Sequence, residues 1–200
     1  MVITVGVLTP HETPGPEIEL PDLAAGQLQV VVSRAAQPEQ AAAALPAVDV
    51  LAIASTGTGY SLGYDEESAL VRRLHERWNV PVCATSMAAV EALQSHHVHR
   101  ISLVHPPWFG QDLNDLGAAY FRSQGFEVVQ AQLADLPDDP EHIQPAMVVD
   151  WVMQHLDPRA EAVFLGGNGF RAARAIDDLQ RRTGRIVLTA NQVLFRFINK

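Results

Sequence analysis

Short apolar runs alternate with segments of helical periodicity along this chain, and this alternation is the feature that most restricts its fold. Eight runs have the length and composition of buried strands. Between them lie segments such as residues 66–78, where Leu70, Leu74 and Trp78 fall on one helical face. Strands that alternate with helices form mostly parallel sheets covered by helices on both faces. The sequence therefore predicts an α/β fold.

The order of predicted elements repeats once. Residues 2–98 and residues 100–188 each contain four predicted strands, although the two stretches share negligible sequence identity. We therefore expect two pseudo-symmetric, flavodoxin-like half-domains, residues 1–98 and 99–200, each with a four-stranded, mostly parallel sheet flanked by helices. The last helix could pack back on the first half. The predicted strands are residues 2–8, 28–32, 48–54, 80–84, 100–104, 125–129, 162–165 and 185–188.

A glycine-rich segment follows the third predicted strand of each half. Residues 55–59 read Ser-Thr-Gly-Thr-Gly, and residues 166–169 read Gly-Gly-Asn-Gly before a helix predicted over residues 172–182. Loop N–H groups at the start of a helix attract anions, and glycine lets a ligand come close to the backbone. Ligands of open parallel sheets bind beyond the carboxyl ends of the strands. The two segments predict one cleft for a small acid, while the simpler alternative is a pair of tight turns.

Charge and cysteine content exclude several classes of function. The chain has 14 Lys and Arg against 23 Asp and Glu, a net charge of −9, which argues against a nucleic acid or an anionic membrane surface as partner. The apolar runs are too short to span a membrane, and residues 1–6 lack the positive region of a signal peptide. The single cysteine, Cys83, excludes an internal disulfide. We expect a cytoplasmic protein.

Several motifs together resemble the aspartate/glutamate racemase superfamily, and within it the maleate cis-trans isomerases and arylmalonate decarboxylases. The resemblance implies catalysis without a metal ion or organic cofactor, on a small carboxylic or dicarboxylic acid, through an enediolate intermediate. It also implies a possible homo-oligomer. The matching segments are Thr9-Pro10 with Glu17, Ser55-Thr56-Gly57, residues 80–93, residues 167–176 and residues 185–192.

The sequence departs from this family where its members place catalytic cysteines, after the third strand of one or both halves. Ser55 stands at the first position, and Gly166 or Gly167 stands at the second, with the register left open. The resemblance thus implies an isomerase, racemase or decarboxylase whose proton-transfer groups are not cysteines. The alternative is a binding or vestigial protein without chemistry. A flavodoxin-like binder of FMN or phosphate is less favoured, since flavodoxins place their glycine loop after the first strand.

The candidate catalytic residues come from the two glycine-rich segments and from residues 9–17. Three prolines and a glycine predict that residues 9–17 form an irregular loop, which should overhang the cleft. Its histidine and glutamate are candidate acids or bases, although a solvated loop explains them equally simply. The candidate catalytic residues are Ser55, His11, Glu12 and Asn168.

The candidate substrate-binding residues lie on the same rim. Tyr60 could donate to a carboxylate or simply pack. Arg171, predicted in the first turn of a helix, could bind a carboxylate through two hydrogen bonds or form a structural salt bridge. Ser86 follows a predicted strand, where Thr85 and Ser86 offer a helix-capping hydroxyl. The predicted binding residues are Thr56, Gly57, Thr58, Tyr60, Ser86, Trp108, Phe109, Gly167, Gly169 and Arg171.

Three other features are weaker candidates. Cys83 lies inside a predicted strand, where a cysteine is usually a small core residue. His105 ends a strand at the predicted rim and could act as an acid or base. The neighbouring histidines His96, His97 and His99 follow a helix, where cations suit the negative end of the helix dipole, so we predict no metal site.

Overall fold

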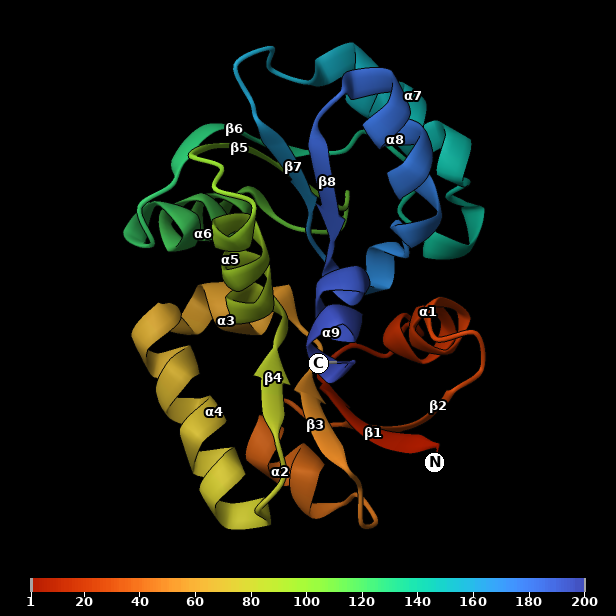
Figure 1. Cartoon of the computed structure of the whole chain (residues 1–200), viewed down its shortest axis with the longest axis vertical. Helices are drawn as coiled ribbons and strands as arrows, with labels where there is room; N and C mark the ends of the chain where they lie inside the picture. Colours follow the sequence, from red (N-terminus) through yellow and green to blue (C-terminus); the bar gives the residue numbers. More distant parts are fainter. Residues whose placement is uncertain (1, 200) are drawn as a thin grey trace.

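The computed structural model describes residues 2–199 and contains two four-stranded parallel sheets, one in each lobe (Figure 1). The strand order is β2-β1-β3-β4 in the first sheet and β6-β5-β7-β8 in the second. The α/β fold with two matching sheets is thereby confirmed. The strands are β1 (Ile3–Thr9), β2 (Leu28–Arg34), β3 (Val50–Ile53), β4 (Val82–Ala84), β5 (Arg100–His105), β6 (Glu127–Leu133), β7 (Ala162–Leu165) and β8 (Ile186–Thr189).

The two sheets share the same pairing register at the ends of their central strands. Ala54 donates its backbone N–H to the carbonyl of Leu8 at 2.9 Å, and Gly166 donates to the carbonyl of Val104 at 2.9 Å. Because Leu8 pairs with the end of β3 and Val104 with the end of β7, these contacts correspond. The equivalent residues of the two halves are then Ala54 with Gly166, Ser55 with Gly167, and Thr56 with Asn168.

Helices cover both faces of each sheet, as fully buried parallel strands require. In the first sheet α1 and α9 pack on one face and α2 and α4 on the other. In the second sheet α5 and α6 pack on one face and α7 and α8 on the other. None of the helices within residues 2–199 is long and apolar enough to cross a membrane. The helices are α1 (Pro16–Leu23), α2 (Pro38–Ala43), α3 (Thr56–Leu62), α4 (Tyr64–Trp78), α5 (Thr85–Ser95), α6 (Gln111–Ser123), α7 (Pro145–His155), α8 (Ile176–Thr183) and α9 (Ala190–Ile198).

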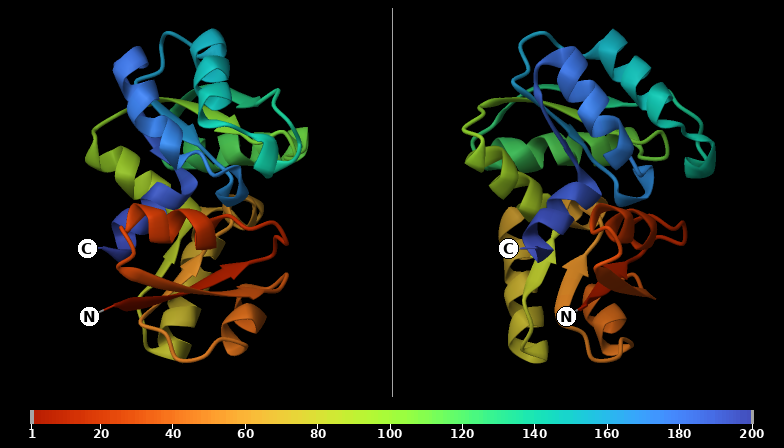
Figure 2. Two further views of the ribbon diagram at one scale, coloured as in Figure 1. Left: turned by 90° about the vertical axis from the view of Figure 1, so that its right-hand side faces the viewer. Right: turned by 45° about the vertical axis from the view of Figure 1, so that its right-hand side comes forward.

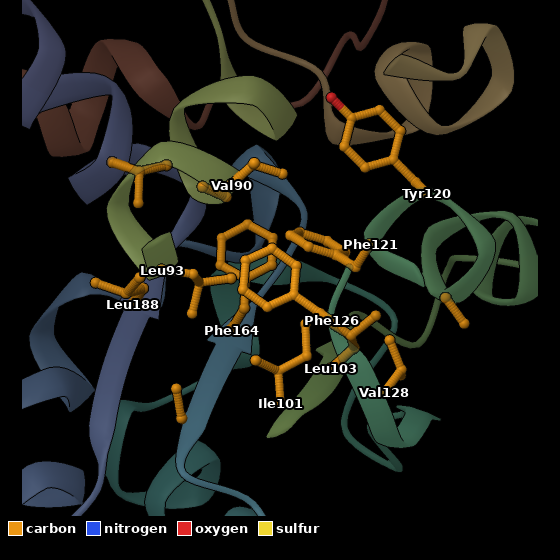
Figure 3. Packing of buried hydrophobic residues seen from close by; sticks show 14 of the residues in the cluster. Val90, Leu93, Ile101, Leu103, Tyr120, Phe121, Phe126, Val128, Phe164 and Leu188 are labelled. Atoms are coloured by element: carbon orange, nitrogen blue, oxygen red, sulfur yellow. The ribbon is translucent and has the colours of Figure 1, made fainter. Parts of the chain in front are cut away.

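The two halves exchange their last helices. Helix α5 follows β4 of the first sheet but packs on the second, and Figure 3 shows Val90 and Leu93 of α5 directed toward Phe164 and Leu188. Helix α9 follows β8 of the second sheet, and its Leu194 is buried against the first. Each such buried leucine contributes about 2 kcal/mol. The lobes are stacked with these helices at their junction (Figure 2).

This exchange bears on the division of the chain into residues 1–98 and 99–200. The strands of the two sheets fall on either side of that boundary. However, α5 and α9 each cover the sheet of the other half, so neither range carries a full set of covering helices. The division into two domains stays a prediction.

Two segments predicted as loops form helices instead. Helix α1 begins at Pro16, inside the predicted loop of residues 9–17, because proline suits the first helical turn and the Gly15 carbonyl accepts from the N–H groups of Ile18 and Glu19. Helix α3 begins at Thr56, within the predicted glycine-rich loop. Of the glycines in α3, Gly59 has no room for a side chain, because a Cβ there would lie 2.3 Å from Glu67 Oε1 and from Ser86 Oγ.

The segment after β7 also differs from the prediction. A helix was expected from residue 172, but the chain forms two short 3₁₀ turns, η2 (Asn168–Phe170) and η3 (Ala173–Ala175), before α8 begins at Ile176. Gly167 and Arg171 both have positive φ angles, +87° and +51°, and these interrupt helical continuation. A third 3₁₀ turn, η1 (Pro140–His142), precedes α7.

Candidate functional site

The two glycine-rich segments meet between the sheets, where equivalent residues of the two halves bind each other. The N–H of Thr56 donates to Oδ1 of Asn168 at 3.3 Å, and the N–H of Gly167 donates to Oγ1 of Thr56 at 3.0 Å. Both contacts are buried. The predicted cleft residues therefore lie together, but these two N–H groups already have protein partners. The sequence left open whether Gly166 or Gly167 corresponds to Ser55. In the structure the residue equivalent to Ser55 is Gly167.

Asn168 is the centre of a buried polar network that extends to α1, α5 and α9. Its Nδ2 donates to Oδ1 of Asn191 at 2.9 Å and to Oγ1 of Thr85 at 3.1 Å. Asn191 Nδ2 in turn donates to Oε2 of Glu19 at 2.8 Å and to the carbonyl of Asn168 at 2.9 Å. A carboxylate only accepts, so Glu19 fixes which end of the Asn191 amide faces it. The orientation of both amides follows from that single constraint.

Three residues of this network were not among the predicted site residues: Glu19, Thr85 and Asn191. Burial raises the pKa of Glu19, an effect opposed by hydrogen bonds from Asn191 and from the N–H of Ala173. Asn191 follows β8 at the carboxyl edge of the second sheet, a position that could have signalled it. Thr85 was expected to cap α5, but α5 begins at Thr85 itself, whose hydroxyl donates to the carbonyl of Ile53. No sequence pattern singles out Glu19.

Ser55 and His11 form a hydrogen-bonded pair. Ser55 Oγ lies 3.3 Å from Nε2 of His11, and it accepts from the N–H of Thr58 at 3.1 Å and from the Thr58 hydroxyl at 2.9 Å. A serine oxygen has two lone pairs and one proton. Because the two hydrogen bonds from Thr58 use both lone pairs, the hydroxyl proton of Ser55 points at the imidazole of His11. His11 as a whole residue is exposed, but the protein partly desolvates its imidazole ring, and this lowers the pKa of His11 below its ordinary value. The ring is therefore neutral at neutral pH, and Nε2 can accept a proton.

The segment that carries His11 is held over this region by contacts with β2 and with the second half. Arg34 donates from Nε to the His11 carbonyl at 2.9 Å and forms an ion pair with Glu17. Gly15 packs directly against the carbonyl of Asn168, where a Cβ would have no room. Glu12, the other candidate of this segment, is exposed. The predicted overhanging segment thus lies against the inter-half contact, and its histidine rather than its glutamate reaches Ser55.

No comparable side chain is available at the equivalent position of the second half. A Cβ on Gly167 would lie 2.8 Å from Cγ of Pro106, and the φ angle of Gly167 is +87°. A Cβ on Gly166 would lie 2.6 Å from Cδ2 of His105. A cysteine, or any side chain, fits neither position without displacing a neighbour. Of the two equivalent positions, only the one in the first half carries a side chain, that of Ser55.

His105 and Tyr60 form a hydrogen bond with each other in the interior, and they do not line the rim of the predicted cleft. Nδ1 of His105 lies 2.9 Å from Oδ1 of Asn114, and Nε2 lies 3.1 Å from the hydroxyl of Tyr60. Burial lowers the pKa of His105 to about 4, so the neutral ring donates to Asn114 and accepts from Tyr60. The Tyr60 hydroxyl, expected to donate to a substrate, therefore donates to His105. Both side chains are buried.

The remaining predicted residues occupy varied positions. Ser86 is buried, and its hydroxyl donates to the carbonyl of Thr56 at 3.4 Å. Phe109 is buried and stacks on His105 with ring centroids 5.4 Å apart, whereas Trp108 is 37% exposed. Gly169 is open, because its Cβ would meet only Trp108, at 3.8 Å. Gly57 packs against Leu113.

Arg171 and Cys83 complete the set of candidates. Arg171 does not lie in a helix as predicted but follows η2 in a left-handed conformation, φ +51° and ψ +47°. Cys83 is buried in the core of the first sheet, and burial raises the pKa of its thiol to about 12. It behaves as a core residue. Within residues 2–199 no group of three or more His, Cys, Asp and Glu side chains is arranged to hold a metal ion.

Comparison with known proteins places this geometry in context. A sequence model of the arylmalonate decarboxylase family matches residues 20–195. That range includes Ser55, Thr85, Asn168 and Asn191 but begins after His11 and Glu19. A search among curated proteins gave no match.

Solved structures with the same fold have low sequence identity to the chain. The maleate cis-trans isomerase of Nocardia farcinica, solved as a mutant with a covalently bound succinylcysteine intermediate, has a TM-score of 0.85 at 18% identity, covering 99% of this chain and 91% of that one. The maleate isomerase Iso of Pseudomonas putida has a TM-score of 0.85 at 18% identity, with 99% and 92% covered. Unliganded arylmalonate decarboxylase has a TM-score of 0.83 at 17% identity, with 98% and 90% covered.

Proposed function

The chain belongs to the arylmalonate decarboxylase family, and on that premise we propose that it is a cofactor-independent isomerase or lyase acting on a small carboxylic or dicarboxylic acid. The reaction passes through an enediolate-type intermediate, reached by loss of an α-proton, by loss of carbon dioxide from a malonate, or, with maleate, by addition of a nucleophile to the alkene. Isomerase and lyase outcomes share this intermediate. They differ in the step that forms it.

The observation that carries the proposal is the contact between Ser55 Oγ and His11 Nε2. A neutral imidazole at 3.3 Å from a hydroxyl whose proton points at it is the arrangement of a serine assisted by a base. We assign His11 as the group that accepts or returns the proton at the substrate α-carbon, with Ser55 beside it as the relay. General acid–base catalysis of this kind contributes about 100- to 10,000-fold to a rate.

Substrate entry requires a rearrangement at the inter-half contact. Ser55 is only 1% exposed, and the N–H groups of Thr56 and Gly167 are occupied by protein acceptors. We propose that a substrate carboxylate displaces Asn168 Oδ1 from the Thr56 N–H when the segment carrying His11 lifts. Asn168 and Thr56 then hold the developing enediolate, as preorganised donors do in other enzymes of acyl and carboxylate chemistry.

The occupied donors also favour a second candidate, a binding protein for small acids without chemistry. In that case the same displacement occurs on binding, but His11 transfers no proton. The two candidates differ in turnover and not in affinity.

The test follows maleate, aspartate, glutamate and substituted malonates by proton NMR in D₂O. One spectrum reports isomerisation, loss of carbon dioxide and deuterium entry at the α-carbon. Ser55→Ala and His11→Asn should each lower the rate by about 100-fold or more. His142→Asn, at an exposed histidine far along the sequence, should leave it unchanged.

Each outcome of this test supports or contradicts one of the two candidate functions or the residue assignment. Turnover that survives both Ser55→Ala and His11→Asn would contradict the residue assignment. Thermal stabilisation by one of these acids without turnover would favour the binding protein. Neither turnover nor stabilisation by any of these acids would remove both candidates.

A further inference from the structure

A cavity of about 390 Å³ lies away from Ser55 and His11, between α1, the turn η1 and the start of α7. Part of its wall is apolar, formed by Ile18, Pro140, Ile143 and Pro145. Ile18 is 40% exposed. Arg171 and Arg174 also line the cavity and supply positive charge. Neither Ser55 nor His11 lines this cavity, so it is separate from the proposed reaction centre.

The guanidinium of Arg171 is the feature that indicates a ligand. Every other arginine within residues 2–199 makes a hydrogen bond, an ion pair or a cation–π contact. Arg171 has only a charge attraction to Glu19. Both oxygens of Glu19 are already occupied, one by the N–H of Ala173 and one by Asn191. The N–H groups of the Arg171 guanidinium therefore have no hydrogen-bond partner in the described protein, although the residue is half-buried.

The charged residues beside Arg171 restrict the kind of ligand that the cavity can bind. Arg174 lines the same wall, but its guanidinium is paired with Asp22 at 2.8 Å. The carboxylates of Glu19, Asp22 and Glu141 also line the cavity and bring negative charge to it. A ligand with several negative charges, such as phosphate, would be repelled by these carboxylates. A single carboxylate could still bind Arg171 through two parallel hydrogen bonds.

We propose that this cavity binds a monocarboxylate with an apolar body, the carboxylate on Arg171 and the body against Ile18, Ile143 and the two prolines. Arg171 keeps a left-handed backbone, φ +51°, which glycine or asparagine would adopt at lower cost. The site is a binding site beyond the reaction centre, and it does not depend on turnover.

The test uses benzoate as the probe, titrated into the full chain by calorimetry and by ¹H–¹⁵N NMR. We expect saturable binding, with amide shifts concentrated at Ile18, Ile143 and Arg171. Arg171→Gln should weaken binding by about tenfold or more, since a charge-assisted hydrogen-bond pair is lost. Arg171→Lys, which keeps the charge but loses the fork, should also weaken it. Arg174→Gln, at the paired arginine of the same wall, should change the affinity far less.

Control ligands and a further variant distinguish binding at this cavity from binding at the reaction centre. Methyl benzoate should bind more weakly than benzoate, and inorganic phosphate should not compete. Ser55→Ala should leave benzoate affinity unchanged, whatever it does to turnover. The proposal is overturned if benzoate does not bind, if Arg171→Gln and Arg171→Lys both bind it normally, or if the shifts centre on His11 and Ser55. Loss of stability in Arg171→Gln with unchanged binding would show that Arg171 serves only to neutralise Glu19.

Discussion

Thr56 and Asn168, equivalent residues of the two halves, are joined by a hydrogen bond of 3.3 Å from the Thr56 N–H to Asn168 Oδ1. The same asparagine donates to Thr85 and Asn191, so one side chain connects α3, α5 and α9. Because the halves also exchange helices, this contact lies at the centre of a junction built from both. The substrate binding that we propose would therefore break a contact that stabilises this junction.

Asn168→Ala should destabilise the protein by about 3 kcal/mol, since it leaves the Thr56 N–H and the Asn191 carbonyl oxygen buried without partners. Asn168→Asp keeps the acceptor for Thr56 but adds a charge to a buried network that contains Glu19. Its loss of stability should be larger at pH 8 than at pH 5. Urea unfolding at both pH values measures this, and an Asn168→Ala variant as stable as the parent would contradict the described network.

Glu67→Gln should stabilise the protein at neutral pH. Glu67 is fully buried between α4 and α6, Tyr120 donates to one of its oxygens, and burial raises its pKa from 4.5 to about 7. Figure 3 shows the Tyr120 hydroxyl pointing out of the apolar cluster. A carboxyl group whose pKa is higher in the folded state contributes stability below pH 4.5, and loses it as the pH rises to about 7.

The shift at Glu67 corresponds to about 3 kcal/mol between those two pH values. Glutamine stays neutral, so the variant should lack this decline. Chemical unfolding from pH 4.5 to 7.5 measures it, with Glu66→Gln as an exposed neighbour for comparison. A pH dependence identical to that of the parent would refute the assignment to Glu67.

His105→Gln should change the pH dependence in the opposite direction. Burial lowers the pKa of His105 from 6.5 to about 4, so its contribution to stability is present above pH 6.5 and is lost as the pH falls toward 4. Between pH 4.5 and 6.5 this effect opposes that of Glu67, and the parent protein should show a shallow net dependence. Each variant alone should give a steeper profile than the parent. Parallel profiles for the two variants would be incompatible with this explanation.

The two cysteine positions of the family should tolerate a thiol very differently. Ser55 has an extended backbone, φ −156°, so Ser55→Cys should fold and place a thiol beside His11. Gly167→Cys combines a φ of +87° with a Cβ 2.8 Å from Pro106, and should cost about 2 to 3 kcal/mol. Gly169→Cys is the matched control, since only Trp108 lies near, at 3.8 Å. Thermal unfolding ranks the three variants.

In Ser55→Cys the new thiol should react with iodoacetamide faster than Cys83, because burial raises the pKa of Cys83 to about 12. Mass spectrometry of the labelled peptides separates the two sites. Equal labelling of both cysteines would show that the segment carrying His11 does not activate position 55.

The proton-transfer rate of an active preparation should depend on His11 in its neutral form. Because burial lowers the pKa of His11, the rate should stay on a plateau at neutral pH and fall only below the ordinary histidine range. The initial rate of α-deuteration measured against pH tests this. An inflection above pH 7, or one that persists in His11→Asn, would assign the proton transfer to another group.

The repeat of apolar runs was sufficient to predict all eight strands and the parallel α/β architecture, because strand periodicity is local and visible in sequence. Helices α1 and α3 were not predicted, because their segments contain proline or glycine, residues that disfavour a helix. In α3 the helix persists because Gly59 packs beneath Glu67 and Ser86, where a Cβ would clash. In α1 the helix forms because Pro16 suits the first helical turn and the Gly15 carbonyl accepts from the N–H groups of Ile18 and Glu19.

By itself, the sequence determined which strands form, which segments follow their carboxyl ends, and that Ser55 and His11 were candidates. Only the tertiary structure decided that these two meet at 3.3 Å, that Tyr60 turns to His105, and that Arg171 faces a cavity beyond the predicted cleft. The physical reason is that strand formation depends on neighbours a few residues away. A contact between residues 44 apart depends on β1 pairing with β3, and the exchange of α5 and α9 depends on which sheet offers the better apolar face.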